Sequence, residues 1–574
     1  MRYLTPKSVV GIVLLLLGVF LPSSMIVGLR STTASGILLE QLQLGAMLLK
    51  VSLAVLGLFI LVTTRLSILT RHQTKKPLFD GIPLSDIYVL VAILFAATAL
   101  RFYRLGDGLW FDEIVTYVKY VRVPLGEVLS TYDNQNQHLF YSLLGNLAIQ
   151  LFGDSAWSLR LPAVLFGLGS IGAIYLLGRE VANSREALIS AALIAFSYHH
   201  VWFSQNARGY TGLLFFTILA SWLFLRALRT GSSRLWALYA VAVSLGAYTL
   251  IYMVFVVLGH IAIYLATIYH DRKMKGTAEI WTGLIFGFIL SGILTFLLHA
   301  LVLPQFLEAF ANPEVGGPIW THPLWGILEF AKGMQINFSG SLVALCAIAL
   351  FGAGLWNYAL KKPAVVGLLL IPSITCVALK VLLGHHLWPR SLFFVMGFGA
   401  LVVVRGIMLF GELACGLMHR LRIGIAGLPW PKGWEGLVGV VFCTVLVLVS
   451  ALSVPFAYGP KQDFQGALAF VENHREPDDA VVTVGLATFP YKNLYKTDWK
   501  DIETLNALDD IRTRSKRTWL VYTIPIQLQD SFPEINASVR NDFREVKQFG
   551  GTLNGGTVFV CEGDPVTHPL AKLE

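Results

Sequence analysis

Long runs of apolar residues recur along most of this chain, with short polar segments between them. The first three extend over residues 9–29, 44–62 and 86–99, and similar runs continue as far as residue 451. A helix that crosses the roughly 30 Å hydrocarbon core of a bilayer needs about 20 apolar residues, and by this measure we count about 13 candidate spans. The pattern predicts an α-helical polytopic membrane protein, whose first run is retained as an anchor because a second span follows it at once.

The pattern changes near residue 455, beyond which apolar runs are short and turn residues are frequent. DFQGALAFVENH has apolar residues at helical spacing, whereas AVVTVGL, TWLVYTI and GTVFVCEG are typical of buried strands. Residues 456–574 are therefore predicted to form a small α/β domain. Its sequence contains no nucleotide-binding loop, catalytic triad or metal-ligand cluster, so we expect it to recognise a substrate, contact a partner or act as a lid.

The composition agrees with a membrane location, since 55% of the residues are hydrophobic and only 14% are charged. The net charge is +9, but acidic residues outnumber basic ones after residue 455, so the excess of basic residues belongs to the apolar part. Basic residues beside hydrophobic spans indicate cytoplasmic loops and contacts with membrane lipids. The high isoelectric point is thus no argument for a nucleic-acid partner.

The basic clusters predict the orientation of the spans. By the positive-inside rule they face the cytoplasm, which leaves residues 102–138, 199–209, 304–340 and 384–390 and the C-terminal domain outside. Residues 138–152 break the alternation, and they are few for a crossing. We interpret them as a re-entrant or interfacial helix, the alternative being a true crossing that inverts the next few loops. The clusters lie at Arg65, Arg71, Lys75 and Lys76, at Arg179 and Arg185, at Arg226, Arg229 and Arg234, at Arg272, Lys273 and Lys275, at Lys361 and Lys362, and at Arg405, Arg420, Arg422 and Lys432.

The first predicted outer loop carries two adjacent acids, Asp112 and Glu113, close to the end of a span and after two aromatic residues. Adjacent residues point in different directions on a helix, so we expect the two carboxylates to have different roles. One role is that of a general base, which accepts the proton of a substrate hydroxyl. The alternative is structural, with Asp112 as the cap of a helix that begins at Glu113.

The order of several motifs resembles a known family. LWFDE is followed by HLFYSLL, by LFGDSAWSLRLPAVLFG with the basic turn GREVANSREA, and by SYHHVWFSQNARGYTGLL. Over residues 86–230 this order is similar to that in bacterial relatives of the dolichyl-phosphate-mannose protein mannosyltransferases and in the lipid A aminoarabinose transferases. The resemblance implies a GT-C fold, a sugar donor linked to polyprenyl phosphate, and inversion at the sugar carbon. It also implies that Asp112 is the catalytic carboxylate and Glu113 its companion acid.

The same resemblance suggests substrate-binding residues. Many relatives have prolines before a Leu-Tyr-Tyr-like run, whereas this chain has none from Asn136 to Tyr141, which leaves the contacts of His138 and Tyr141 open. A later His of the relatives is replaced here by Leu250. We therefore predict no required metal, although Asp112, Glu113 and His138 could together hold a divalent ion.

A lipid phosphate at the membrane surface needs fixed cations to offset its desolvation, and the arginine fork matches phosphate oxygens. Arg208 with Tyr210, in SQNARGY, and Arg390, in GHHLWPRSLFF, stand at predicted outer ends of spans. We expect these three residues to bind the donor. The alternative is that both arginines only extend their charged heads to the interface.

These observations predict an inverting membrane glycosyltransferase that moves a sugar from a polyprenyl-phosphate donor to a glycan, lipid or protein acceptor outside the plasma (inner) membrane. Two N-terminal transmembrane helices and a cytoplasmic loop are expected in residues 1–84, the GT-C-like catalytic domain in residues 85–455, and an extracytoplasmic α/β domain in residues 456–574. The competing hypothesis is a secondary transporter or lipid flippase, which would place ionisable groups near the middle of the membrane.

Overall fold

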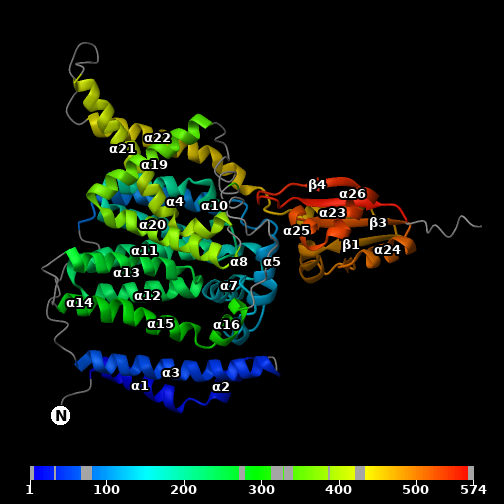
Figure 1. Ribbon diagram of the computed structural model, residues 1–574, viewed down its shortest axis with the longest axis horizontal. Helices are drawn as coiled ribbons and strands as arrows, with labels where there is room; N and C mark the ends of the chain where they lie inside the picture. Colours follow the sequence, from blue (N-terminus) through cyan, green and yellow to red (C-terminus); the bar gives the residue numbers. More distant parts are fainter. Residues whose placement is uncertain are drawn as a thin grey trace, which may run out of the picture.

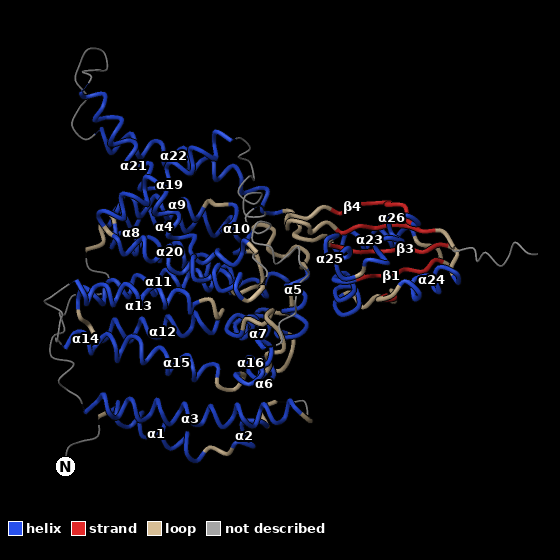
Figure 2. The backbone as a smooth tube through the Cα atoms, viewed as in Figure 1, coloured by secondary structure: helices blue, strands red, loops and turns tan. Residues whose placement is uncertain are grey.

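The chain folds into a bundle of long helices with a smaller α/β region at one end (Figure 1). In this computed structural model the described residues are 5–30, 34–65, 81–270, 278–311, 328, 341–385, 388–420 and 434–565. All strands within these ranges lie in the α/β region, and the bundle is entirely helical (Figure 2). The predicted α-helical membrane architecture with a small C-terminal α/β domain is confirmed.

Nine helices of the described residues are long and apolar enough to cross a membrane, or ten if a pair bent by 61° counts as one span. The predicted number of about 13 spans is therefore not confirmed by this length criterion. Three apolar helices are shorter, namely Pro6–Phe20, Leu139–Phe152 and Leu345–Lys361. The elements of the bundle are α1 (Pro6–Phe20), α2 (Ser23–Val27), α3 (Ile37–Arg65), α4 (Leu84–Phe102), α5 (Phe111–Val115), η2 (Thr116–Val121), α6 (Leu125–Ser130), α7 (Leu139–Phe152), α8 (Ala156–Val181), α9 (Ser184–Ala195), α10 (Tyr198–Ser204), α11 (Tyr210–Thr230), α12 (Ser233–Thr249), α13 (Met253–His270), α14 (Ala278–Thr282), η3 (Gly283–Ile289), α15 (Leu290–His299), α16 (Leu303–Ala311), α19 (Ser341–Lys361), α20 (Pro363–Leu382), η4 (Pro389–Val395), α21 (Met396–Arg420), α22 (Trp434–Ser453) and η5 (Val454–Tyr458).

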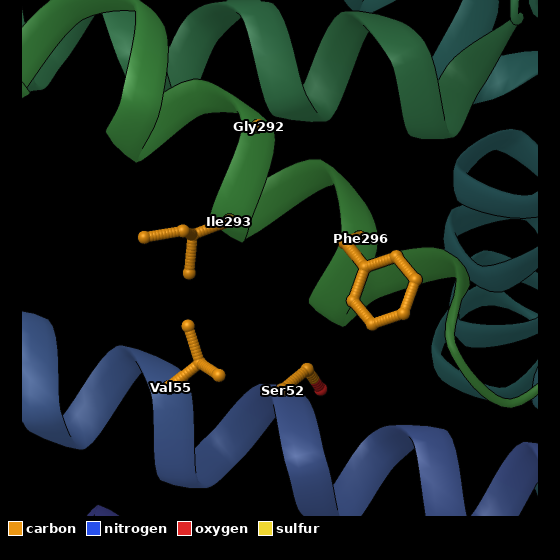
Figure 3. A pocket seen from close by; sticks show the side chains of 5 residues that line it. All are labelled: Ser52, Val55, Gly292, Ile293 and Phe296. Atoms are coloured by element: carbon orange, nitrogen blue, oxygen red, sulfur yellow. The ribbon is translucent and has the colours of Figure 1, made fainter.

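The N-terminal helices α1 and α3 pack closely because glycine lies at their contact. A Cβ atom on Gly18 would lie 2.6 Å from the backbone oxygen of Lys50, so the two helix axes approach through this residue. On its other side α3 faces α15 across a cavity of about 210 Å³ (Figure 3). Its lining is apolar except for Ser52, whose hydroxyl donates to the carbonyl of Leu49 at 2.8 Å. This cavity is a gap between membrane helices and carries no chemistry.

Helix α7 lies along the first outer loop. The side-chain amide of Asn146, near its middle, donates to the carbonyls of Val121 and Val123 at 2.8 and 2.9 Å. Just after its end, Asp154 accepts a hydrogen bond of 2.7 Å from Tyr117 of the same loop. A helix of 14 residues is about 21 Å long, which is shorter than the hydrocarbon core. These contacts favour the re-entrant or interfacial interpretation of this helix.

The α/β region is a five-stranded sheet in the order β2-β1-β3-β5-β4. Strand β1 pairs in parallel with β2 and β3, and β5 pairs antiparallel with β3 and β4. The three strands predicted from apolar runs are β1, β3 and β5; β2 and β4 were missed because one is short and the other is largely polar. The elements are α23 (Phe464–His474), β1 (Asp479–Val484), η6 (Gly485–Ala487), η7 (Pro490–Leu494), β2 (Lys500–Ile502), α24 (Leu505–Arg514), β3 (Arg517–Thr523), α25 (Pro525–Ser531), α26 (Pro533–Asp542), β4 (Phe543–Phe549) and β5 (Val558–Gly563).

The α/β region packs directly on the loop that contains α5. Ile114 of α5 is fully buried and lies in one apolar cluster with Phe464 and Tyr491 of the C-terminal region. The rings of Phe111 and Phe489 meet edge to face at 6.4 Å. The sheet therefore sits at the end of the bundle where the two predicted acids lie (Figure 1).

Candidate active site

Asp112 lies on the short helix α5 and forms an ion pair with a residue from a distant span. Nη1 of Arg390, on η4, donates to Oδ2 of Asp112 at 2.9 Å. The Asp112 side chain is 14% exposed and that of Arg390 31%, so the pair remains accessible from outside. The structure thus brings together two predicted site residues separated by 278 positions.

Glu113 has very different surroundings, because it is fully buried and all its strong contacts are internal. Nε and Nη2 of Arg160 donate to its two carboxylate oxygens at 2.8 and 2.6 Å, and the amide of Ala207 donates at 2.6 Å. Burial raises the pKa of Glu113, but the charge and hydrogen bonds of Arg160 outweigh that effect and hold the pKa below its usual value. The carboxylate is therefore ionised and fixed in place.

Arg160 was not predicted, and it organises the loop before α5. Its guanidinium also donates to the carbonyls of Leu105, Asp107 and Gly108 at 2.8 to 2.9 Å. An arginine within an apolar span is costly unless a carboxylate pairs with it, which is the signal that the sequence offered. Together Arg160 and Glu113 join α8, the α5 loop and the loop before α11.

A second group of residues gathers around Arg208. Its Nη1 donates to the hydroxyl of Thr116 at 2.6 Å and to the carbonyl of Asn136, and its Nη2 lies 3.2 Å from Nε2 of His138. The guanidinium is 5.9 Å from the ring centre of Tyr210. Asn136 also donates to the carbonyl of Asp112 at 3.3 Å. The structure therefore places Arg208, His138 and Tyr210 in one cluster that connects to Asp112.

This cluster has more hydrogen-bond donors than acceptors. The amide of Gly209 donates to Nδ1 of His138 at 2.8 Å, so a neutral imidazole carries its proton on Nε2, facing the guanidinium of Arg208. Burial, and then the charges of Arg208 and Arg390, lower the pKa of His138 well below its usual value, which keeps the ring neutral. Two buried donors, Nε of Arg208 and Nδ2 of Asn206, have no partner among the described residues. An anionic ligand with several oxygens would supply the missing acceptors.

Tyr141 was predicted to bind substrate, but its surroundings are those of a core residue. It is fully buried, and its hydroxyl donates to the carbonyl of Leu159 at 2.6 Å. Nor do Asp112, Glu113 and His138 come together as a ligand set: within the described ranges no group of three or more His, Cys, Asp and Glu side chains is arranged to hold a metal ion.

Two further residues of this site come from the segment between the last span and the sheet. Nζ of Lys461 donates to the carbonyl of Gln205 at 2.8 Å and lies 4.8 Å from the ring centre of Trp202. Burial lowers the pKa of Lys461 to about 7, against the opposing charge of Glu113. Gln462 accepts a hydrogen bond of 3.1 Å from the amide of Phe111. Their position directly after the last apolar run was the only signal in the sequence.

Comparison with known proteins gives a match in the central part of the chain. Residues 137–299 match the family model described as dolichyl-phosphate-mannose-protein mannosyltransferase. A curated relative, the putative mannosyltransferase YkcB of Bacillus subtilis (strain 168), is 26% identical over 169 residues. That alignment covers 26% of this chain, and the chain spans 22% of the length of that relative.

Two solved structures illustrate the matches of low identity. The oligosaccharyltransferase of Archaeoglobus fulgidus, tethered with an acceptor peptide, aligns with 83% of this chain and 74% of its own at 12% identity and a TM-score of 0.48. ArnT of Cupriavidus metallidurans in the apo state aligns with 83% of this chain and 98% of its own at 14% identity and a TM-score of 0.45. We base no argument on overlays at these scores. The sequence match confirms the predicted resemblance, and residues 137–299 carry a domain of the dolichyl-phosphate-mannose-protein mannosyltransferase family.

Proposed function

We propose that this protein is a membrane glycosyltransferase of the GT-C type that transfers a sugar from a polyprenyl-phosphate donor to an acceptor hydroxyl on the extracytoplasmic face. The observation that carries the proposal is the accessible Asp112–Arg390 pair beside the donor-rich cluster of Arg208, at one end of a helical membrane bundle. The family match over residues 137–299 and the name of the Bacillus relative make mannose the first sugar to test.

The direction of three spans supports the extracytoplasmic face. Helix α8 begins beside the site, α11 begins at Tyr210, and η4 with α21 begins beside Arg390. Each of these spans ends in a basic residue at its far end, namely Arg179, Arg229 and Arg420. Positive residues favour the cytoplasmic side, so the site belongs on the other side.

In the proposed reaction Asp112 accepts the proton of the acceptor hydroxyl as its oxygen attacks the anomeric carbon of the donor sugar. The bond between that carbon and the phosphate oxygen breaks, and the polyprenyl phosphate leaves with the electron pair. Attack from the side opposite the leaving group inverts the configuration. Arg208 and Arg390 stabilise the developing charge on the phosphate.

The ion pair gives the donor an influence on the base. Arg390 holds Asp112 at 2.9 Å, and a phosphate that draws this guanidinium away removes the nearest positive charge from the carboxylate. The proton affinity of Asp112 then rises, which suits a general base. In this scheme the carboxylate becomes an effective base only when the donor is bound.

Glu113 has a positioning role in this proposal, in place of the companion acid expected from the resemblance. Its carboxylate is fully buried and its oxygens accept hydrogen bonds from Arg160 and Ala207, so no lone pair is directed at a substrate. Tyr141, whose hydroxyl is occupied by Leu159, has a packing role.

The test compares cells that express the native chain, Asp112→Asn or no added protein. Mass spectrometry measures glycolipids, glycoproteins and accumulated polyprenyl-phospho-sugars. We expect a glycosylated product and donor consumption only with the native chain, and the added mass identifies the sugar. If Asp112→Asn yields the same products as the native chain, the assignment of Asp112 is wrong and a transporter or flippase becomes the better hypothesis.

A further inference from the structure

Helix α5, which presents Asp112, begins without a capping residue of its own. The residue before its first turn is Trp110, which has no side-chain acceptor, whereas helix starts favour Ser, Thr, Asp or Asn there. The first amides of a helix have no partner within the helix. The amide of Phe111 finds its acceptor 351 positions later, in Oε1 of Gln462 at 3.1 Å.

Gln462 is held firmly for this purpose. It is 2% exposed, and its Nε2 donates to the hydroxyl of Thr523 at 3.1 Å, at the carboxyl end of β3. Thr523 in turn donates to the carbonyl of Thr557 at 3.1 Å. The reversed amide orientation would set two donors against each other at Phe111, so these partners fix which atom faces α5. A continuous hydrogen-bonded chain thus runs from the sheet to the start of α5.

The neighbouring residue secures the other side of the site. Lys461 donates to the carbonyl of Gln205, three residues before Arg208. Two consecutive residues of the C-terminal segment therefore hold both loops of the site, one with Asp112 and one with Arg208.

We propose that Gln462 is a positioning residue for Asp112, and that the C-terminal domain completes the active site by capping α5. This inference rests on the proposed function. A helix of five residues has few internal hydrogen bonds, so loss of the cap lets Asp112 move relative to Arg390 and the donor. A displacement of about 1 Å can cost on the order of a hundredfold in rate.

The test uses three variants of the full-length protein in lipid vesicles. Gln462→Met keeps the length of the side chain and removes the acceptor, and Gln462→Glu retains an acceptor for Phe111. Gln527→Met is the matched control, because Gln527 accepts from the amide of Leu486 within the same domain at 3.2 Å and does not contact α5. The probe is a radiolabelled polyprenyl phosphomannose, and release of its mannose gives kcat and the KM for the donor.

We expect Gln462→Met to lower kcat by about ten- to a hundredfold with a nearly unchanged KM. Gln462→Glu should recover most of the activity, and Gln527→Met should equal the native protein. Hydrogen–deuterium exchange of residues 108–116 supplies a readout independent of catalysis, with faster exchange expected only in Gln462→Met.

The outcomes separate the two proposals. If Gln462→Met matches the native protein in kcat and exchange, or if Gln527→Met loses as much activity, the positioning role is refuted. If the native protein itself consumes no donor, the proposed function fails for this probe. The exchange measurement then decides alone whether Gln462 caps α5.

Discussion

At the scale of single residues, two adjacent carboxylates differ because one is charged and accessible while the other is charged and enclosed. The sequence indicated different roles for Asp112 and Glu113 from their opposite directions on a helix. It could not indicate which acid is buried, because the partner of Glu113 is Arg160, 47 positions away. Arg208, Tyr210 and Arg390 were found from their places at span ends, whereas Lys461 and Gln462 act through contacts that no local pattern reports.

The buried pair gives a stability prediction. Glu113→Gln leaves Arg160 without its counter-charge in a dry environment, so we expect the free energy of unfolding to fall by about 3–5 kcal/mol. Asp498→Asn is the control, because its pair with Arg475 is exposed and worth less than about 1 kcal/mol. Thermal midpoints in detergent measure both changes, and equal midpoints for Glu113→Gln and the native protein would contradict a fixed, ionised Glu113.

Lys461 gives a prediction for pH. Its pKa of about 7 in the folded protein lies below the ordinary value of 10.5, because burial and Arg160 disfavour the cation more than Glu113 favours it. Between these two values the unfolded chain holds a proton that the folded chain has released, so this group makes stability rise with pH. We expect the native thermal midpoint to increase relative to Lys461→Met from about pH 7 towards pH 10. A constant difference across this range would contradict it, and Lys492→Met at an exposed position is the control.

At the scale of elements, apolar periodicity predicted the long spans and three strands, since each buries a continuous face. Strand β4, FREVKQF, is mostly exposed and polar, so its pairing with β5 depends on the tertiary structure. The short helix α7 was interpreted from its length, and its contacts with Val121, Val123 and Tyr117 agree with that interpretation.

The turn between β4 and β5 offers a test at this scale. A Cβ atom on Gly551 would lie 2.2 Å from the carbonyl oxygen of Lys461, a backbone atom that cannot move without shifting the segment before α23. We expect Gly551→Ala to lower the thermal midpoint and to reduce donor consumption. At the adjacent position, Gly550→Ala meets no atom within 4 Å and should behave as the native protein. Equal behaviour of the two variants would show that the turn does not transmit to the site.

At the scale of the whole molecule, the charge pattern predicts which end of the bundle faces outward. The test uses a cysteine-free background with a single reporter, Asp498→Cys in the α/β region or Arg229→Cys at the far end of α11; both side chains are exposed. A membrane-impermeant maleimide should label the first in intact cells and the second only after permeabilisation. The reverse pattern would place the site in the cytoplasm.

The distance along the chain between Phe111 and its acceptor has a consequence for biosynthesis. Asp112 is translated early, and Gln462 follows about 350 residues later, after the last span. While the ribosome is still adding spans, α5 lies at the membrane surface with its first turn uncapped and the donor-binding arginine of η4 not yet made. A nascent chain is therefore catalytically silent, and the enzyme switches on only when its final segment has been exported and folded. Truncations that spare every membrane helix should accumulate as inserted but idle protein.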